Sequence, residues 1–153
     1  MQLWRLTRAE HAPGLDGEGA RLHGGQWNSP GLPMVYAASS LALAVLEVFV
    51  HLPPALRRQG GPPPLVAVAL DLADGDLGEI DVTSLPQKYG IPDCQALGEA
   101  WLLSSAGVAA RVPSQVIAQE WNIVLNPRHS AIGRVTVAAV TPFRFDPRLG
   151  GRS

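Results

Sequence analysis

The segment from Leu41 to Leu52, LALAVLEVFVHL, constrains the fold more than any other part of this 153-residue chain. Ser40 precedes it and is a good helix N-cap, and Pro53 follows it. Because proline disfavours helical geometry in the residue before it, we predict a helix that ends before Pro53. A helix that is apolar on every side is typical of a protein core. The sequence therefore predicts a core helix here.

Glu47 is the one acidic residue of this predicted helix, and every neighbour within three positions is apolar. An ionised carboxylate in such surroundings costs free energy unless a partner pairs with it. A structural interpretation puts Glu47 at a solvated edge of the helix, or in a pair with a structural Arg. A functional interpretation makes it a catalytic carboxylate in a cleft beneath a sheet. The residues themselves leave both interpretations open.

Short apolar runs bounded by turn residues predict strands along the rest of the chain. We expect them at Leu3–Thr7, Met34–Ala37, Leu65–Leu72, Val108–Val112, Gln115–Leu125 and Val135–Phe145. Pro142 in the last one favours an edge strand or a bulge. A second helix is expected at Asp93–Ala106, with Gly107 as its stop. The other segments are expected to be irregular: the Gly-rich Ala9–Gly25, a turn at Asp71–Asp76, and an exposed Pro-rich connector at Arg57–Pro64.

Strands and helices do not alternate regularly, so the fold class is α+β with a mostly antiparallel sheet. The length suits one domain, and we take residues 1–153 as that domain. Only 16% of the residues are charged, which leaves room for an apolar patch and favours a protein partner or self-association.

Composition also argues against several function classes. The net charge is −1 and the basic residues are spread thinly, so no duplex-binding face is expected. Cys94 is the single cysteine and the four histidines lack ligand spacing, so no metal site is expected. The longest apolar run is too short to span a bilayer and nothing resembles a signal peptide, so we expect a cytoplasmic protein without membrane association.

The segment from Gly19 to Tyr36, GARLHGGQWNSPGLPMVY, is one candidate ligand site. Its glycines permit close approach of a ligand, and Arg21, Trp27 and Asn28 offer a charge, a stacking surface and an amide. The alternative is an ordinary surface loop with a buried tryptophan as its anchor. The spacing matches neither common nucleotide-binding glycine motif.

A second candidate site lies in RVPSQVIAQEWNIVLNPRHS, from Arg111 to Ser130. Ser114 follows a proline at a strand junction, where its hydroxyl either caps the backbone or faces a ligand. Asn126 and His129 bracket Pro127 in a turn, where a stabilising hydrogen bond competes with a functional role.

Taken together, these segments resemble the RES domain family, named for an Arg, a Glu and a Ser. The resemblance rests on four blocks in order: Arg5 in LWRLT, the loop that closes on Tyr36, the helix with Ser40, Glu47 and His51, and the late block with Ser114, Asn126 and His129. One departure stands out. The family usually has GGRWN, whereas this chain has GGQWN with Gln26 in place of the arginine.

The resemblance implies a fold similar to the ADP-ribosyltransferase toxins, in which a split sheet holds NAD in a cleft. It implies cleavage of the bond between nicotinamide and ribose, with phosphate, water or a protein side chain as acceptor. NAD is then a substrate, and no cofactor is expected. The implied partner is a cognate antitoxin of the Xre type, which would bind the chain in an oligomer and block the cleft.

The family's chemistry suits the residues that carry the resemblance. Nicotinamide leaves as a neutral molecule, so the developing oxocarbenium ion mainly needs a nearby negative charge, which Glu47 would supply. Tyr36 would stack on the nicotinamide ring or fix its amide, Arg5 and Arg21 would hold the pyrophosphate, and Ser114 would bind the ribose or the acceptor. The expected NAD-binding residues are Arg21, Trp27, Asn28, Asn126 and His129. Two alternatives stay open: an ADP-ribosyltransferase with a protein target, and an inert binding module. The second alternative rests on Gln26, which replaces the arginine usual in the family.

Overall fold

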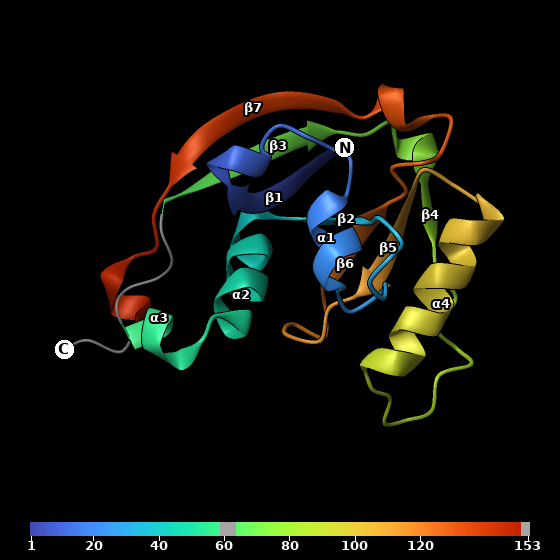
Figure 1. The fold of residues 1–153 in the computed structure, drawn as a ribbon, viewed down its shortest axis with the longest axis horizontal. Helices are drawn as coiled ribbons and strands as arrows, with labels where there is room; N and C mark the ends of the chain where they lie inside the picture. The colour runs from blue at the N-terminus through green and yellow to red at the C-terminus, as the bar shows by residue number, and fades with distance from the viewer. Residues whose placement is uncertain (59–63, 151–153) are drawn as a thin grey trace.

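The computed structural model describes residues 1–58 and 64–150 of the chain. Within them, seven strands form one mixed sheet, with helices against its faces and ends (Figure 1). The strands are β1 Gln2–Arg8, β2 Val35–Ala38, β3 Leu65–Asp71, β4 Leu77–Glu79, β5 Ala109–Pro113, β6 Trp121–Leu125 and β7 Thr136–Phe143. The α-helices are α1 Glu18–His23, α2 Leu41–His51, α3 Pro54–Arg58 and α4 Ile91–Ser104. Short 3-10 turns lie at Ala9–His11, Asp74–Asp76, Ile132–Arg134 and Pro147–Gly150.

The strand order is β4-β5-β6-β2-β1-β3-β7, and the sheet is mostly antiparallel. Among the described residues, the β4–β5 pair is the one parallel pair, because the chain crosses over through α4 before it returns as β5. The expected α+β class with a mostly antiparallel sheet is therefore confirmed. Pro142 lies in β7 at the edge of the sheet, as its missing amide hydrogen requires.

The sheet divides in two at the junction between β1 and β2. These strands share one registered pair, Trp4 with Ala38, whereas β1 and β3 are paired along their whole length. Figure 1 shows β7, β3 and β1 across the top of the molecule, and β6, β5 and β4 running down beside α4. The split sheet expected from the family resemblance is therefore present.

The apolar segment around Glu47 forms α2 with the expected ends. Ser40 caps it by accepting a hydrogen bond from the amide of Leu43 at 3.1 Å, and the helix ends at His51 before Pro53. Leu43 and Ala44 are buried against the β1–β3 part of the sheet. Val50 is 43% exposed, because the sheet covers α2 on one side only. The helix is thus a cover on the sheet, and the prediction of a helix buried on every side was wrong.

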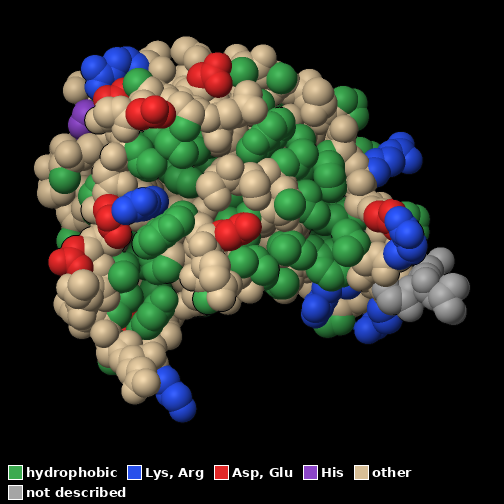
Figure 2. All heavy atoms as spheres, turned by 180° about the vertical axis from the view of Figure 1, so that it is seen from behind, with side chains coloured by type: hydrophobic (Ala, Val, Ile, Leu, Met, Phe, Trp, Pro, Cys, Tyr) green, Lys and Arg blue, Asp and Glu red, His purple; other side chains and the backbone are tan. Residues whose placement is uncertain are grey.

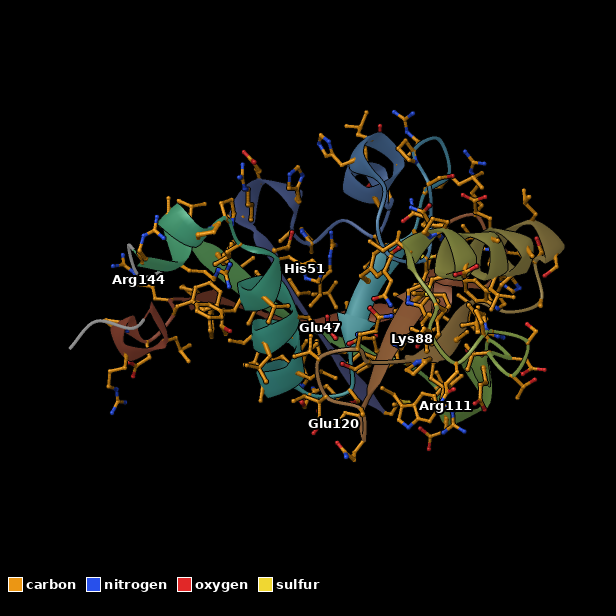
Figure 3. All side chains as sticks on the ribbon, turned by 90° about the horizontal axis from the view of Figure 1, so that it is seen from below. Glu47, His51, Lys88, Arg111, Glu120 and Arg144 are labelled. Carbon is orange, nitrogen blue, oxygen red and sulfur yellow. The ribbon has the colours of Figure 1, made fainter. Side chains whose placement is uncertain are left out.

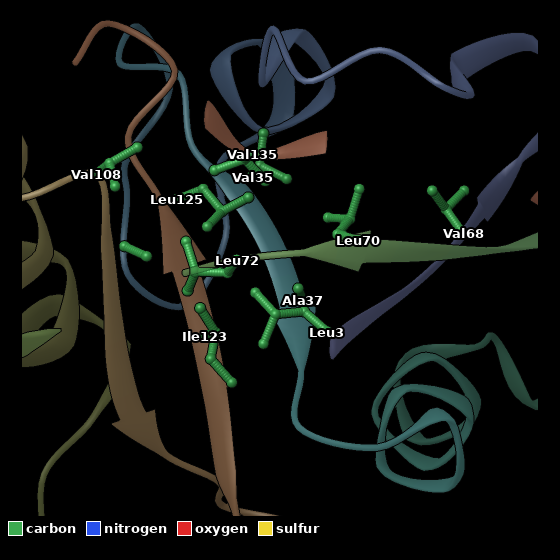
Figure 4. Close-up of a cluster of buried hydrophobic side chains, with 11 residues drawn as sticks. Leu3, Val35, Ala37, Val68, Leu70, Leu72, Val108, Ile123, Leu125 and Val135 are labelled. Carbon is green, nitrogen blue, oxygen red and sulfur yellow. The ribbon is translucent and has the colours of Figure 1, made fainter. Parts of the chain in front are cut away.

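The main hydrophobic core lies where the two parts of the sheet curve toward each other. Figure 4 shows side chains of β1, β2, β3 and β6 meeting there, among them Leu3, Val35, Leu70 and Ile123. Each of these four side chains is at most 1% exposed. This packing fixes the angle between the two parts of the sheet, and with it the space beneath their junction.

Several predicted segments differ from the observed ones. The Gly-rich segment holds α1, and the predicted connector begins inside α3, although residues 59–63 of that connector lie outside the described part of the chain. The strand predicted from Gln115 begins at Trp121, because residues 115–120 form bends and a turn. The second helix ends at Ser104, where Ser105 takes the left-handed conformation that was expected of Gly107.

The short strand β4 was not predicted at all, because its three residues carry no alternating pattern. No helix within residues 1–58 and 64–150 has the length and the apolar composition that a membrane span requires.

Candidate active site

A cleft of about 520 Å³ lies beneath the junction of β1 and β2, in the size range of small-molecule sites. One side is formed by α2 and by Asn122 near the start of β6. The other side is formed by the Gly-rich loop, residues 24–34 between α1 and β2. Figure 3 shows Glu47 and His51 on the side of α2 that faces this space. The polar or aromatic side chains among the lining residues are Trp4, Arg5, Gln26, Trp27, Tyr36, Glu47, His51 and Asn122.

Glu47 is half-buried and is held by two neutral donors. The Ser114 hydroxyl donates to its Oε1 at 2.7 Å, and the Asn122 amide donates to the same oxygen at 2.6 Å. No Arg of the described chain forms an ion pair with Glu47, and its Oε2 accepts no hydrogen bond there. The carboxylate therefore lies at a cleft with one oxygen saturated and the other available.

Ser114 combines the two roles that its sequence position left open. Its oxygen accepts hydrogen bonds from the amides of Val116 and Ile117 at 3.1 and 3.0 Å, which shapes the turn after β5. Its single hydrogen is directed at Glu47. The residue is 4% exposed and is not among the lining residues, so in this structure it acts on the cleft through Glu47.

Asn122 was not singled out from the sequence. It is the second residue of β6, it is 9% exposed, and it lines the cleft beside Glu47. The signal that was available is an amide within the apolar strand WNIVL, the same kind of signal that marked Glu47. His51, one helical turn after Glu47, also lines the cleft, and its Nδ1 contacts the Glu47 carbonyl oxygen at 2.7 Å.

Tyr36 forms the opposite side of the cleft with its ring. Its hydroxyl donates to Asn28 Oδ1 at 2.6 Å and accepts from the amide of Trp27 at 2.9 Å. Burial raises the pKa of Tyr36, although the hydrogen bonds with Trp27 and Asn28 act in the opposite direction. Gly25 lies so close to the ring that a Cβ there would be 2.6 Å from the hydroxyl oxygen. The Tyr36 hydroxyl is therefore hydrogen-bonded within the loop, and its ring lines the cleft.

Asn28 and Trp27 organise the Gly-rich loop from inside. The Asn28 amide is fully buried and donates to the carbonyls of Ala20 and Leu32 at 2.8 and 2.9 Å. Trp27 is 1% exposed, and its side chain belongs to a core cluster with Met34 and other residues. The structure therefore supports the alternative of a buried tryptophan anchor: Trp27 is among the residues that line the cleft, but its ring is almost fully buried, and the Asn28 amide is already hydrogen-bonded.

Helix α4 supports the loop from behind. A Cβ on Gly98 would lie 1.9 Å from the Trp27 carbonyl oxygen, so helix and loop are in direct backbone contact. Gln95 donates to the carbonyls of Gly25 and Asn28 at 3.0 and 3.1 Å. Glu99 accepts hydrogen bonds from the amide and the hydroxyl of Ser29. The loop is therefore fixed by a helix that lies 70 residues further along the chain.

The two candidate arginines occupy different places. Arg5 lines the cleft and donates to the Gly14 carbonyl at 2.6 Å. Burial lowers the pKa of its guanidinium, and the charge of Asp16 acts in the opposite direction. Arg21 forms an exposed ion pair with Glu18 and is not among the lining residues. Gln26, at the position where the family usually has arginine, lines the cleft and contacts the Cys94 sulfur at 3.8 Å.

Asn126 and His129 stabilise the turn after β6 and are not among the lining residues. Asn126 accepts from the amide of Arg128 at 3.0 Å, and His129 Nδ1 accepts from the amide of Ala131 at 3.0 Å. The structure thus brings Arg5, Tyr36 and Glu47 together at the cleft, joins Ser114 to them through Glu47, and leaves this turn outside.

The model of the RES domain matches residues 2–146 of the chain. The chain belongs to the RES domain family. Its relatives include the proteins named Toxin Res of Photorhabdus laumondii, 34% identical over 83% of this chain and 82% of that protein, and of Yersinia enterocolitica, 30% identical over 97% and 99%. The Prs ADP-ribosylating toxin of a Sphingobium species is 32% identical over 95% of this chain and 94% of that protein.

A solved structure also shares the fold of this RES domain. The M. tuberculosis MbcT–MbcA toxin–antitoxin complex contains a chain that matches with a TM-score of 0.72, at 23% identity, over 98% of this chain and 86% of that one. At this identity the likeness concerns the fold alone. The relatives named as toxins, matched over most of their length, make this chain a homologue of bacterial toxins.

Proposed function

We propose that this RES-domain protein is the toxin of a toxin–antitoxin pair and that it cleaves the bond between nicotinamide and ribose in NAD. The observation that carries the proposal is Glu47: a carboxylate at the cleft, with Oε1 held by two donors and Oε2 unpaired among the described residues. A fixed negative charge of this kind suits a reaction that develops positive charge on a sugar.

The other residues at the cleft suit the parts of NAD that flank this bond. The Tyr36 ring offers a flat surface to the nicotinamide, and its hydroxyl stays bound to the loop. Arg5 is a cation at the same cleft, which suits the pyrophosphate because a guanidinium matches two phosphate oxygens at once. Because nicotinamide departs as a neutral molecule, Glu47 needs only to stabilise the ribosyl cation and to orient a ribose hydroxyl.

The proposed partner is an antitoxin of the Xre type, with both proteins in the cytoplasm. The solved structure that shares this fold is part of a toxin–antitoxin complex, which supports the pairing. The surface supports it too, because hydrophobic side chains gather over the middle of the face seen from behind (Figure 2). An extended apolar area of this kind is typical of a surface that is covered by another protein.

The test is to incubate the purified protein with NAD, with and without phosphate, and to follow the products by chromatography. Loss of NAD that requires phosphate identifies a phosphorylase, and loss in water alone identifies a glycohydrolase. We expect Glu47→Gln to lower kcat by at least about 100-fold, since it removes the charge and keeps the shape. Glu120→Gln, at an exposed carboxylate, is the matched control. Full NAD cleavage by Glu47→Gln would remove this residue from the mechanism.

A second candidate function is transfer of ADP-ribose to a protein. The relative named Prs ADP-ribosylating toxin favours it, because it matches over 95% of this chain. NAD labelled on the adenosine, incubated with the protein and a bacterial extract, distinguishes the two: label that stays with a protein band indicates the transferase. An inert binding module, the reading suggested by Gln26, would give neither product nor label.

A further inference from the structure

We propose that Asn122 is a positioning residue, which together with Ser114 holds the Glu47 carboxylate in the one orientation that serves the reaction. This inference rests on the proposed function and adds a third segment of the chain to its site. Glu47 comes from α2, Ser114 from the turn after β5, and Asn122 from β6.

Both donors converge on the same carboxylate oxygen. Asn122 Nδ2 lies 2.6 Å and Ser114 Oγ lies 2.7 Å from Glu47 Oε1. A carboxylate held by one donor can still turn about its last bond, whereas two donors from different segments fix its plane. Glu47 Oε2 has no partner among the described residues, so it is available to accept a hydrogen bond from a substrate hydroxyl. Preorganisation of this kind is how an enzyme avoids reorientation during the reaction.

The oxygen of the Asn122 amide supports a functional reason for this orientation. Its Oδ1 is buried and has no hydrogen-bond partner among the described residues. A buried unpaired acceptor costs free energy, and such groups are rare in folded proteins. An apolar side chain of similar size would avoid the cost in this apolar strand. The hydrogen bond that the amide donates to Glu47 is therefore the reason for a polar residue at this position.

The decisive variant is Asn122→Leu, which keeps the volume and removes both the donor and the unpaired acceptor. We expect kcat for NAD cleavage to fall at least 10-fold, with KM within about threefold and a melting temperature that is unchanged or higher. A structural role predicts the reverse pattern: a lower melting temperature with kcat preserved. Ile123→Val, the adjacent core residue, calibrates that reverse pattern.

Asn122→Asp tests the donor itself, because it keeps the shape and places a second carboxylate beside Glu47. We expect it to lower kcat more than Asn122→Leu does, since like charges repel at this distance. Equal kcat for the wild type and both variants would overturn the proposal.

A crystal structure of Asn122→Leu separates this inference from the proposed function. If the Glu47 carboxylate turns away from β6, Asn122 positions it, whatever the substrate proves to be. If the carboxylate keeps its place on Ser114 alone, the inference is wrong, even where the wild type cleaves NAD. A wild type that leaves NAD intact overturns the proposed function, and the orientation of Glu47 in the variant still decides the role of Asn122.

Discussion

The two sides of the cleft differ in how their polar groups are paired. The carboxylate wall, made of Glu47, Ser114 and Asn122, joins side chain to side chain and leaves Glu47 Oε2 and Asn122 Oδ1 unpaired among the described residues. The loop wall, made of Gly24–Asn28 and Tyr36, pairs the side chains of Asn28 and Tyr36 with each other and with the backbone, and it leaves Trp27 Nε1 as a buried donor without a partner among the described residues.

This difference indicates a separate role for each wall of the cleft. In the carboxylate wall Glu47 offers an unpaired oxygen at the cleft, so this wall is suited to chemistry. In the loop wall the polar groups of Asn28 and Tyr36 are paired, and Trp27 Nε1 is buried, so this wall is suited to hold its shape. Substitutions in the first wall should therefore change kcat, and substitutions in the second should change stability and KM.

The largest effect is expected from Gly98→Ala, behind the loop wall. The added Cβ would lie 1.9 Å from the Trp27 carbonyl oxygen, and backbone cannot move aside cheaply. We expect a loss of about 3 kcal/mol in the free energy of unfolding, measured by urea denaturation. Gly133→Ala is the control, since nothing lies within 4 Å of its Cβ. A stable Gly98→Ala protein would show that helix and loop are not in rigid contact.

Next in size is Ser114→Ala, in the carboxylate wall. The change removes one of the two donors to Glu47, and we expect kcat to fall about 10- to 100-fold, or about 1.4 to 2.7 kcal/mol. Stability should fall by about 1 kcal/mol, since the amides of Val116 and Ile117 lose their acceptor. Steady-state kinetics and thermal denaturation of the same sample measure both. An unchanged kcat together with the stability loss would make Ser114 a turn cap alone.

The smallest effect is a pH dependence that comes from Tyr36. Burial raises the pKa of its phenol in the fold, whereas an unfolded tyrosine ionises near pH 10. The unfolded state therefore releases the proton first, and stability is retained below pH 10 and lost above it. We expect a loss of about 1 kcal/mol between pH 10 and 11, measured as the difference between the wild type and Tyr36→Phe. Parallel curves for the two proteins would show that the phenol is not protected by the loop.

Local signals in the sequence predicted part of this fold well. The N-cap Ser40 and the stop at Pro53 act within one turn of the helix, so the ends of α2 followed from their neighbours alone. Pro142 indicated an edge strand for the equally local reason that it lacks an amide hydrogen. Glu47 stood out because a charge among apolar residues needs an explanation wherever the chain folds.

The features that the sequence did not reveal depend on distant contacts. Asn122 meets Glu47 across 75 positions, and no pattern within β6 indicates that partner. Helix α4 packs on the loop through Gly98, and this contact makes Trp27 and Asn28 internal supports of the loop. The sequence around a single helical glycine does not predict such a contact. The residues that resemble a family motif thus include some that line the cleft, such as Glu47 and Tyr36, and others that support the loop or a turn, such as Asn28 and Asn126.

The order in which the chain is synthesised gives the carboxylate wall one more property. Glu47 leaves the ribosome well before its donors, which follow 67 and 75 positions later. Until the last third of the chain has emerged and β6 has joined the sheet, the carboxylate has no fixed orientation. A chain that ends before residue 114 lacks both donors to Glu47. The carboxylate wall is therefore complete only when most of the chain has been translated.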